Sequence, residues 1–356
     1  MSSQPTRREI ILTGGAATLA GLAGCGSPLS TSAPEPATGG DSETQPDAQP
    51  DDYTEIYEAT IDSVVLVETD GQGTGFMYDD QHIVTNAHVV GTAQSARLRF
   101  TEGRWSTARV VGSDPHSDLA VLAVDDVPEA ASPLSFADDD PEVGQRVLAI
   151  GNPYNLNGTM TNGIISGVNR SIPSPAGFEI PDAIQTDAPV NPGNSGGPLV
   201  DLDGDVVAVI NSGGGDNIGF GISAALTQRV IPELLTTGDY EHAYMGVSFE
   251  DVTPTVARVN DLPASRGLLV VGVAPGGPSD GRLQPSSEIS IVDGERVPVG
   301  GDVIRAVDDT TIETSEALGS YLALETNPGE TVDVTVLRDG REQTVQIELG
   351  TRPTGV

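Results

Sequence analysis

The chain has 356 residues, room for about two domains, and its 37% hydrophobic content is enough for packed cores. All 17 basic residues are arginine, and 52 acidic residues give a formal net charge of −35. This balance argues against nucleic acid as a partner, because the phosphate backbone requires clustered positive charge. Frequent glycine and proline with few aromatics favour short strands and many turns, so we expect a mostly β protein.

The acidic residues are spread along the whole chain, which makes the charge a property of the entire surface. Such a surface keeps a protein soluble at the cost of self-repulsion, which high salt screens. We therefore expect a protein adapted to high salt, as in a haloarchaeal source. A dedicated basic partner is the alternative that the sequence leaves open.

Residues 1–25 have the features of an export signal. Arg7 and Arg8 precede the apolar stretch Ile10–Leu22, which is too short for a permanent membrane helix. The twin arginines predict export by the Tat route. The single cysteine, Cys25, ends a Leu-Ala-Gly-Cys sequence that resembles the processing site of prokaryotic lipoproteins. We expect a lipid on Cys25 that anchors the protein to the outer face of the cytoplasmic membrane, with an incidental thiol as the alternative.

Residues 26–52 are rich in small and polar residues and are expected to be a disordered tether. Short apolar runs then alternate with turns, which favours a β-sandwich or barrel. The helix Ala225–Leu235 closes this first domain, residues 53–238. Its strands are expected at Ser63–Glu68, Thr74–Tyr78, Arg97–Phe100, Ser106–Gly112, Leu119–Val124, Arg146–Ile150 and Val206–Ile210.

A second domain, residues 243–350, follows a linker at 239–242. A helix is expected at Ser315–Leu324 with Thr314 as its N-cap, and an extra loop at residues 286–300. The strands of this domain are expected at Gly267–Val273, Asp302–Val307 and Thr331–Leu337.

The sequence Asn-Pro-Gly-Asn-Ser-Gly-Gly-Pro at residues 191–198 predicts a hydroxyl on a tight, exposed turn. Ser195 is therefore the candidate nucleophile, which requires a base and an orienting acid. His88 is the candidate base because it follows an apolar strand, where we expect that strand to break into a polar turn. Asp118 is the candidate acid because it opens a buried strand, where a carboxylate needs a partner.

The other candidate acid and the other three histidines are expected to be solvated. Asp114 lies in a Ser-Asp-Pro turn, and the other three histidines, His82, His116 and His242, are expected on the surface. The Asp-rich run 201–205 resembles a calcium loop, but Asp-Gly between two apolar runs predicts a hairpin turn instead. Since no set of histidines and cysteines has the spacing of a zinc site, we expect no metal and no cofactor.

The order His88, Asp118, Ser195 is the chain order of chymotrypsin-type proteases. The segments 85–90, 117–122 and 193–198 resemble the three signature stretches of the trypsin-like family. Gln185–Ala188 and Ile218–Ser223 resemble the HtrA (DegP/DegQ-type) branch. The elbow of α/β hydrolases is the rival for Gly193–Gly197, but it requires an acid and a histidine after the serine, and only linker His242 follows.

The resemblance implies two six-stranded antiparallel β-barrels followed by a small α+β PDZ domain. It also implies an oxyanion hole from the N–H groups of Gly193 and Ser195. Pro189 should lie at the floor of the S1 pocket, which predicts a small or aliphatic P1 residue. Substrate contacts are implied for Ile210, Asn211, Ser212 and Ile218.

In the second domain, Tyr244, Met245, Gly246 and Val247 stand where PDZ domains bind a peptide carboxylate, and Gly301–Ile304 resembles a common PDZ stretch. Together these features predict an exported, lipid-anchored serine endopeptidase acting on unfolded or damaged proteins and binding C-terminal peptides. A homotrimer is implied by the resemblance. The alternative is a catalytically silent chaperone or PDZ adaptor on a protease fold.

Overall fold

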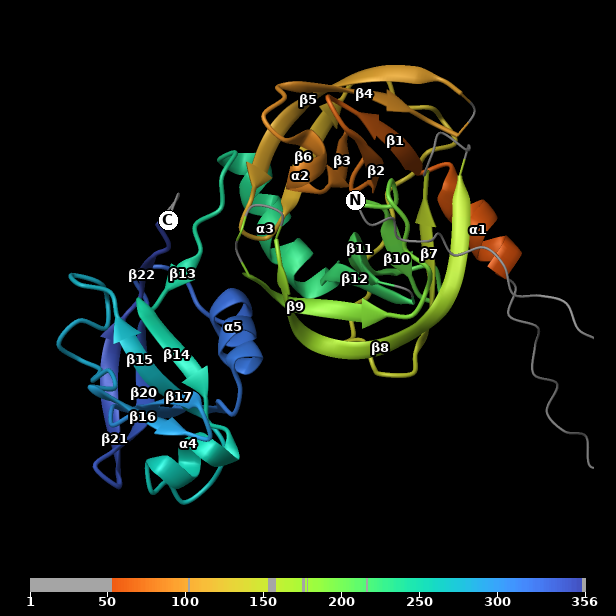
Figure 1. Ribbon diagram of the computed structural model, residues 1–356. Helices are drawn as coiled ribbons and strands as arrows, with labels where there is room; N and C mark the ends of the chain where they lie inside the picture. The colour runs from red at the N-terminus through yellow and green to blue at the C-terminus, as the bar shows by residue number, and fades with distance from the viewer. Residues whose placement is uncertain are drawn as a thin grey trace, which may run out of the picture. The chain divides into compact units, whose positions relative to one another are not determined.

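The first part of the folded chain closes into a barrel of six antiparallel strands, drawn in orange and brown in Figure 1. The computed structural model describes residues 53–101, 103–152, 158–174, 177, 179–215 and 217–353. Helix α1 (Tyr53–Ile61) precedes the barrel and the short helix α2 (Ala87–Val90) interrupts it. The strands, in the order β1-β2-β3-β6-β5-β4, are β1 (Val64–Glu68), β2 (Gln72–Met77), β3 (His82–Thr85), β6 (Leu119–Val124), β5 (Trp105–Asp114) and β4 (Ser95–Arg99).

A second closed barrel of six strands follows and leads into helix α3 (Ala224–Thr236). Ser223 caps this helix, because its side chain accepts a hydrogen bond from the Leu226 N–H. The strands, in the order β10-β11-β12-β9-β8-β7, are β10 (Pro198–Val200), β11 (Val206–Gly215), β12 (Ile218–Ser223), β9 (Glu179–Thr186), β8 (Thr159–Pro173) and β7 (Arg146–Gly151).

One hydrophobic cluster contains residues of both barrels, which fixes how their loops meet. Phe76 and Leu119 of the first barrel belong to the same buried cluster as Ile150 and Val209 of the second. Apolar residues of α3, including Val230, complete this cluster. The polar loops at the edge of this interface are therefore held at defined positions, as a catalytic site requires.

The C-terminal domain is a sheet in the order β14-β15-β18-β20-β21, with β19 on β18. Leu268, Ile304 and Val334 lie in its core. Thr314 caps α5, as expected, by accepting a hydrogen bond from the Ala317 N–H. The elements are β13 (Ala243–Tyr244), β14 (Val247–Asp251), α4 (Pro254–Val259), β15 (Leu268–Val273), β16 (Glu288–Val292), β17 (Glu295–Val299), β18 (Val303–Val307), β19 (Thr310–Thr311), α5 (Ser315–Leu324), β20 (Thr331–Arg338), β21 (Arg341–Glu348) and β22 (Gly350–Thr351).

The expected mostly β fold with two six-stranded barrels is confirmed. The expected loop at 286–300 is wrong, because β16 and β17 pair there as an antiparallel hairpin. The Asp-rich run 201–205 is the turn between β10 and β11, as expected. Among the described residues, no helix is long and apolar enough to cross a membrane. The export signal, the tether and Cys25 lie outside the described residues.

Candidate active site

The predicted base and acid lie together because their strands are neighbours. β3 pairs with β6 with Thr85 opposite Ala120, which brings the residues after β3 beside those before β6. The two side chains meet with His88 Nδ1 2.6 Å from Asp118 Oδ2, and the His88 N–H donates to Asp118 Oδ1 at 2.8 Å. His88 stands in the short helix α2 and not in the polar turn that we expected. Four helical residues are too few for a periodic signal.

Asp118 adopts a backbone conformation that few residues tolerate. Its φ is +55°, in the left-handed region, and its side chain is almost fully buried. A non-glycine residue there costs about 1–2 kcal/mol, although Asp tolerates it better than most. Hydrogen bonds from the Ala87 N–H and the Asn86 side chain to the Asp118 carbonyl hold this conformation. The sharp turn aims the carboxylate at His88.

Ser195 is linked to the other two residues through Asn211. In the described part of the chain, the Ser195 hydroxyl donates to the Asn211 carbonyl at 2.7 Å and not to His88. The Asn211 side-chain amide donates to Asp118 Oδ2 at 2.6 Å. The sequence indicated Asn211 only as a substrate contact. Its bond to the acid was missed because the two residues lie 93 positions apart.

The loop before Ser195 is a tight turn held by strand β2. The Asn194 N–H donates to the Asn191 carbonyl at 3.0 Å, and Gly193 has φ +99°. Proline at the second and glycine at the third position with positive φ fit a type II turn. Type I and type II turns differ by rotation of the central peptide, so this φ determines where the Gly193 N–H points.

Thr74 of β2 bridges the two barrels at this loop. Its hydroxyl donates to the Gly193 carbonyl at 2.6 Å, and its N–H donates to the Ser195 carbonyl at 2.8 Å. Gly196, with φ +85°, lies so close that an added Cβ would be 2.1 Å from the Thr74 carbonyl oxygen. Glycine is therefore required at that position, as the Gly-rich motif suggested.

The remaining predicted substrate contacts lie around the same loop. Pro189 is exposed, and its carbonyl accepts a hydrogen bond from Thr161 Oγ1 at 2.8 Å. Ile210 is buried in β11, where Ser212 pairs with Phe220 across the ladder. Ile218 opens β12 and is exposed. Their roles toward a substrate stay predictions.

The predicted peptide-binding loop of the C-terminal domain borders a cavity of about 450 Å³. Tyr244 belongs to β13, Met245 is buried, Gly246 has φ +75° and Val247 opens β14. Apolar side chains of α5, including Leu318, line the cavity. This is the combination of a backbone loop and an apolar pocket that an extended peptide can use.

The expectation that Asp114, His116 and His242 are solvated is wrong. Asp114 and His116 are buried, and the His242 side chain is only 10% exposed. Asp114 accepts hydrogen bonds from the N–H groups of His116 and Ser117, and lies 2.7 Å from His242 Nε2. Burial would raise the pKa of the Asp114 carboxyl, but the bonds from His116, His242 and Ser117 outweigh it and hold the pKa well below its usual range. The segment after α3 covers this turn, which its local sequence could not reveal.

Comparison with known proteins agrees with this architecture. The trypsin-like peptidase domain model matches residues 73–209, and the PDZ domain model matches residues 243–349. A probable periplasmic serine endoprotease (DegP-like) of Rhizobium meliloti is 36% identical over 291 residues, covering 80% of this chain and 54% of the relative. The chloroplastic protease Do-like 1 of Arabidopsis thaliana is 36% identical over 298 residues, covering 81% of this chain and 66% of the relative.

The chain thus spans little more than half the length of the bacterial relatives it matches. Solved structures match over nearly their whole length. The HtrA-type protease AlgW, solved with a tripeptide, is 30% identical with a TM-score of 0.68, covering 85% of this chain and 98% of that one. The serine endoprotease of Yersinia pestis is also 30% identical, with a TM-score of 0.61 and the same coverage. The chain belongs to the HtrA family of trypsin-like serine proteases that carry a PDZ domain.

Proposed function

We propose that the chain is a serine endopeptidase that hydrolyses peptide bonds of unfolded or damaged exported proteins. The observation that carries this proposal is the 2.6 Å contact between His88 Nδ1 and the buried Asp118 carboxylate. A carboxylate on Nδ1 leaves Nε2 to act as the base, and it stabilises the imidazolium that forms. The His88 side chain is 29% exposed, so a substrate can reach it.

In this mechanism Ser195 attacks the scissile carbonyl while His88 takes the hydroxyl proton. His88 then protonates the leaving amine, and water reverses the sequence on the acyl-enzyme. The N–H groups of Gly193 and Ser195 stabilise the oxyanion, and losing one such donor raises a barrier by about 2.7–4 kcal/mol. Before attack, the Ser195 hydroxyl must leave the Asn211 carbonyl, to which it donates in this structure.

The proposed specificity is for a small or aliphatic P1 residue. Pro189 offers no charge to a basic P1 side chain, and neighbouring Ile210 and Ile218 are apolar. Digestion of a peptide library should give cleavage mainly after small and aliphatic residues. Cleavage mainly after Arg or Lys would contradict this assignment.

The C-terminal domain is proposed to bind the C-termini of substrate proteins. β14 stands at the edge of its sheet, so an extended peptide can pair with it as an additional strand. The loop Tyr244–Val247 would receive the carboxylate on its backbone N–H groups, and the apolar cavity beside α5 would receive the last side chain. This mode supplies affinity through the backbone and selectivity through the pocket.

The location and assembly of the chain are proposed from the matched relatives and from the sequence motifs. The matched DegP-like relatives are named periplasmic, which supports export of this chain. We propose the Tat route, a lipid on Cys25, a position on the outer face of the cytoplasmic membrane, and a homotrimer adapted to high salt.

A fluorophosphonate probe tests the catalytic proposal. Such a probe reacts with an activated serine, so it should label the chain and fail to label the Ser195→Ala and His88→Ala variants. Labelling is measured over a range of salt concentrations because the chain is highly charged. Absence of label at every salt concentration would favour the alternative, a catalytically silent chaperone or PDZ adaptor.

A further inference from the structure

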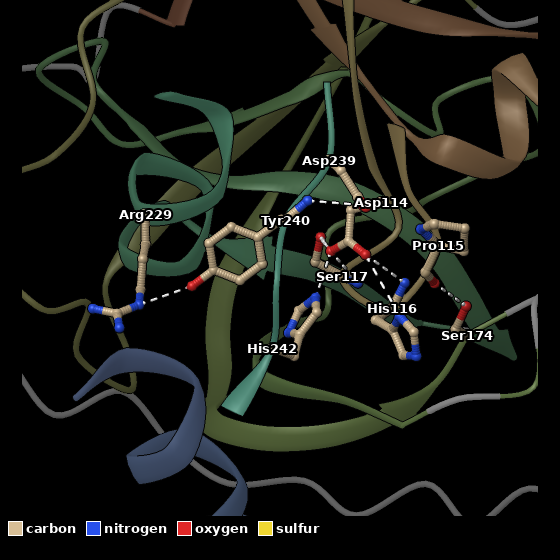
Figure 2. Close-up of polar contacts among 9 residues, drawn as sticks. All are labelled: Asp114, Pro115, His116, Ser117, Ser174, Arg229, Asp239, Tyr240 and His242. Carbon is tan, nitrogen blue, oxygen red and sulfur yellow. Dashed lines mark hydrogen bonds and ion pairs between the residues drawn. The ribbon is translucent and has the colours of Figure 1, made fainter. Parts of the chain in front are cut away.

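A second cluster of chemically active side chains lies outside the catalytic site. Figure 2 shows the imidazoles of His116 and His242 directed at the Asp114 carboxylate, which ends β5. The three residues offer ligand atoms that all lie within 4.8 Å of one another. His116 Nδ1 is 3.7 Å from Asp114 Oδ1, and His242 Nε2 is 2.7 Å from Asp114 Oδ2. The proposed peptidase mechanism uses none of them.

We propose that Asp114, His116 and His242 form a binding site for one divalent transition-metal ion of the zinc type. Two imidazoles bound to zinc at about 2.0–2.1 Å and at a tetrahedral angle have ring centroids about 5 Å apart. The His116 and His242 centroids are 5.2 Å apart. Ligand atoms on one such ion are about 3.3 Å apart, and the contacts of the two imidazoles with the two carboxylate oxygens, 2.7 Å and 3.7 Å, lie on either side of this value.

The surroundings hold these ligands in place. The N–H groups of His116 and Ser117 donate to the Asp114 carboxylate at 3.0 Å each, and orienting bonds of this kind raise metal affinity. The His242 ring packs edge-on against Tyr240 with centroids 4.7 Å apart. The Tyr240 hydroxyl in turn accepts a hydrogen bond from Arg229 Nε at 3.0 Å. The Asp114 carboxylate and the His242 ring therefore each have partners that limit their rotation.

The donor set selects the kind of ion. Two imidazoles and one carboxylate suit zinc, cobalt or copper, whereas magnesium and calcium prefer oxygen ligands. Arg352 lines the same cavity as both histidines, and its positive charge weakens the binding of a metal cation there. We therefore expect micromolar affinity, weaker than that of closed structural zinc sites.

A metal ion at this position would join two parts of the chain. His242 lies in the segment between α3 and β13, while Asp114 begins the turn that ends at the catalytic acid Asp118. Asp114 and Asp118 are separated by only three residues, and Ser117 among them donates to Asp114 through its N–H. Metal binding would therefore fasten the start of the C-terminal domain to the turn that positions the acid.

The test is calorimetric titration of Zn²⁺ and Co²⁺ into the full chain carrying Ser195→Ala, which prevents self-digestion. The protein is first stripped with a chelator, and excess Mg²⁺ occupies the acidic surface. We expect one Zn²⁺ per chain, a rise in melting temperature, and a Co²⁺ absorption band typical of nitrogen and oxygen ligands. His116→Gln and His242→Gln should each weaken binding at least tenfold.

His82→Gln is the matched control, since His82 also pairs with an aspartate, Asp79, at 2.8 Å but has no third ligand beside it among the described residues. It should leave the affinity unchanged. Melting of each metal-free variant verifies that it is folded. Absence of stoichiometric binding, or equal binding by folded wild-type, His116→Gln and His242→Gln chains, would overturn the site. Neither result depends on peptidase activity, so this proposal and the catalytic one can fail separately.

Discussion

Asn211 contacts two members of the proposed triad at once. Its side-chain amide donates to Asp118 Oδ2 at 2.6 Å, and its carbonyl accepts from the Ser195 hydroxyl at 2.7 Å. Substitution with alanine removes only the first contact. A hydrogen bond to a charged group contributes about 1.5–3 kcal/mol, and each 1.4 kcal/mol is tenfold in rate. Asn211→Ala should therefore lower kcat about 10- to 100-fold.

The measurement is steady-state cleavage of a peptide substrate. KM should change little, because the lost side-chain contact is to Asp118, whereas the predicted contact of Asn211 with substrate is retained by its backbone. Asn211→Ser retains a side-chain donor at this position and should preserve more activity than the alanine variant. Equal kcat for wild type and Asn211→Ala would show that this amide does not support the acid.

Asp182 is a partly buried acid whose charge opposes folding. Burial raises its pKa, although a hydrogen bond with Ser223 acts in the opposite direction, and the nearby charge of Asp140 raises it further. Since the folded pKa lies above the unfolded one, the carboxyl favours folding below the unfolded value of about 3.9. This contribution is lost as the pH rises through the folded pKa.

Asp182→Asn should therefore raise the melting temperature at pH 7, with the gain vanishing near pH 4. Asparagine tolerates the φ of +56° at this position and can still accept the Ser223 hydrogen bond. The control is Asp139→Asn, which removes the same charge from an exposed residue and should have little effect. A lower melting temperature for Asp182→Asn at pH 7 would contradict the argument.

Short sequence motifs identified the three residues of the proposed triad but did not reveal the residues that contact the site from distant parts of the chain. His88, Asp118 and Ser195 stand in recognisable segments, and the structure brings His88 and Asp118 into contact. Asn211 bonds Asp118 across 93 positions, and His242 approaches Asp114 across 128. Polarity alone predicts exposure for such residues, because burial of these turns comes from segments that are remote in sequence.

Strand β2 supports the loop of Ser195 through Thr74. Its hydroxyl donates to the Gly193 carbonyl at 2.6 Å and accepts from the Asn152 N–H at 2.9 Å. Thr74→Val keeps the shape and the β-branched side chain but removes both bonds, which leaves buried polar groups without this partner. We expect about 1–3 kcal/mol lower stability. We also expect at least tenfold lower kcat, because the Gly193 peptide loses the side-chain bond that holds it, while the bond from the Thr74 N–H to the Ser195 carbonyl remains.

Thr74→Ser is the matched control, since it keeps the hydroxyl and should retain most of the activity. Denaturant unfolding measures the stability and peptide cleavage measures kcat. If Thr74→Val and Thr74→Ser had the same kcat, the hydroxyl would have no role in holding the Gly193 peptide.

Elements were predictable where a buried face gives a continuous apolar run. β1, β6 and β7 were expected within one residue of their observed bounds. β8 was missed because this long strand is mostly exposed or half-buried, and its glycine and asparagine residues are typical of turns. The hairpin β16–β17 was missed for a related reason, since much of it is exposed and acidic residues begin both strands.

The whole molecule carries an excess of negative charge that no local feature explains. Its formal net charge is −35, and the exposed run Asp138–Asp140 lines one cavity together with the acidic residues of the partly exposed turn 201–205. Repulsion among these groups destabilises the folded chain at low ionic strength. Salt shortens the Debye length from about 10 Å at 0.1 M to about 3 Å at 1 M, which screens all but adjacent charges.

The melting temperature should therefore rise steadily between 0.1 M and 1 M NaCl, with a smaller gain above 1 M. Differential scanning calorimetry of the full chain carrying Ser195→Ala measures this without self-digestion. Sorbitol at matched osmolality is the control, because it alters hydration but screens no charge, and it should reproduce only a small part of the rise. A flat or falling melting temperature would mean that repulsion among the acidic residues does not destabilise the folded chain. A basic partner would then be the better explanation of the negative charge.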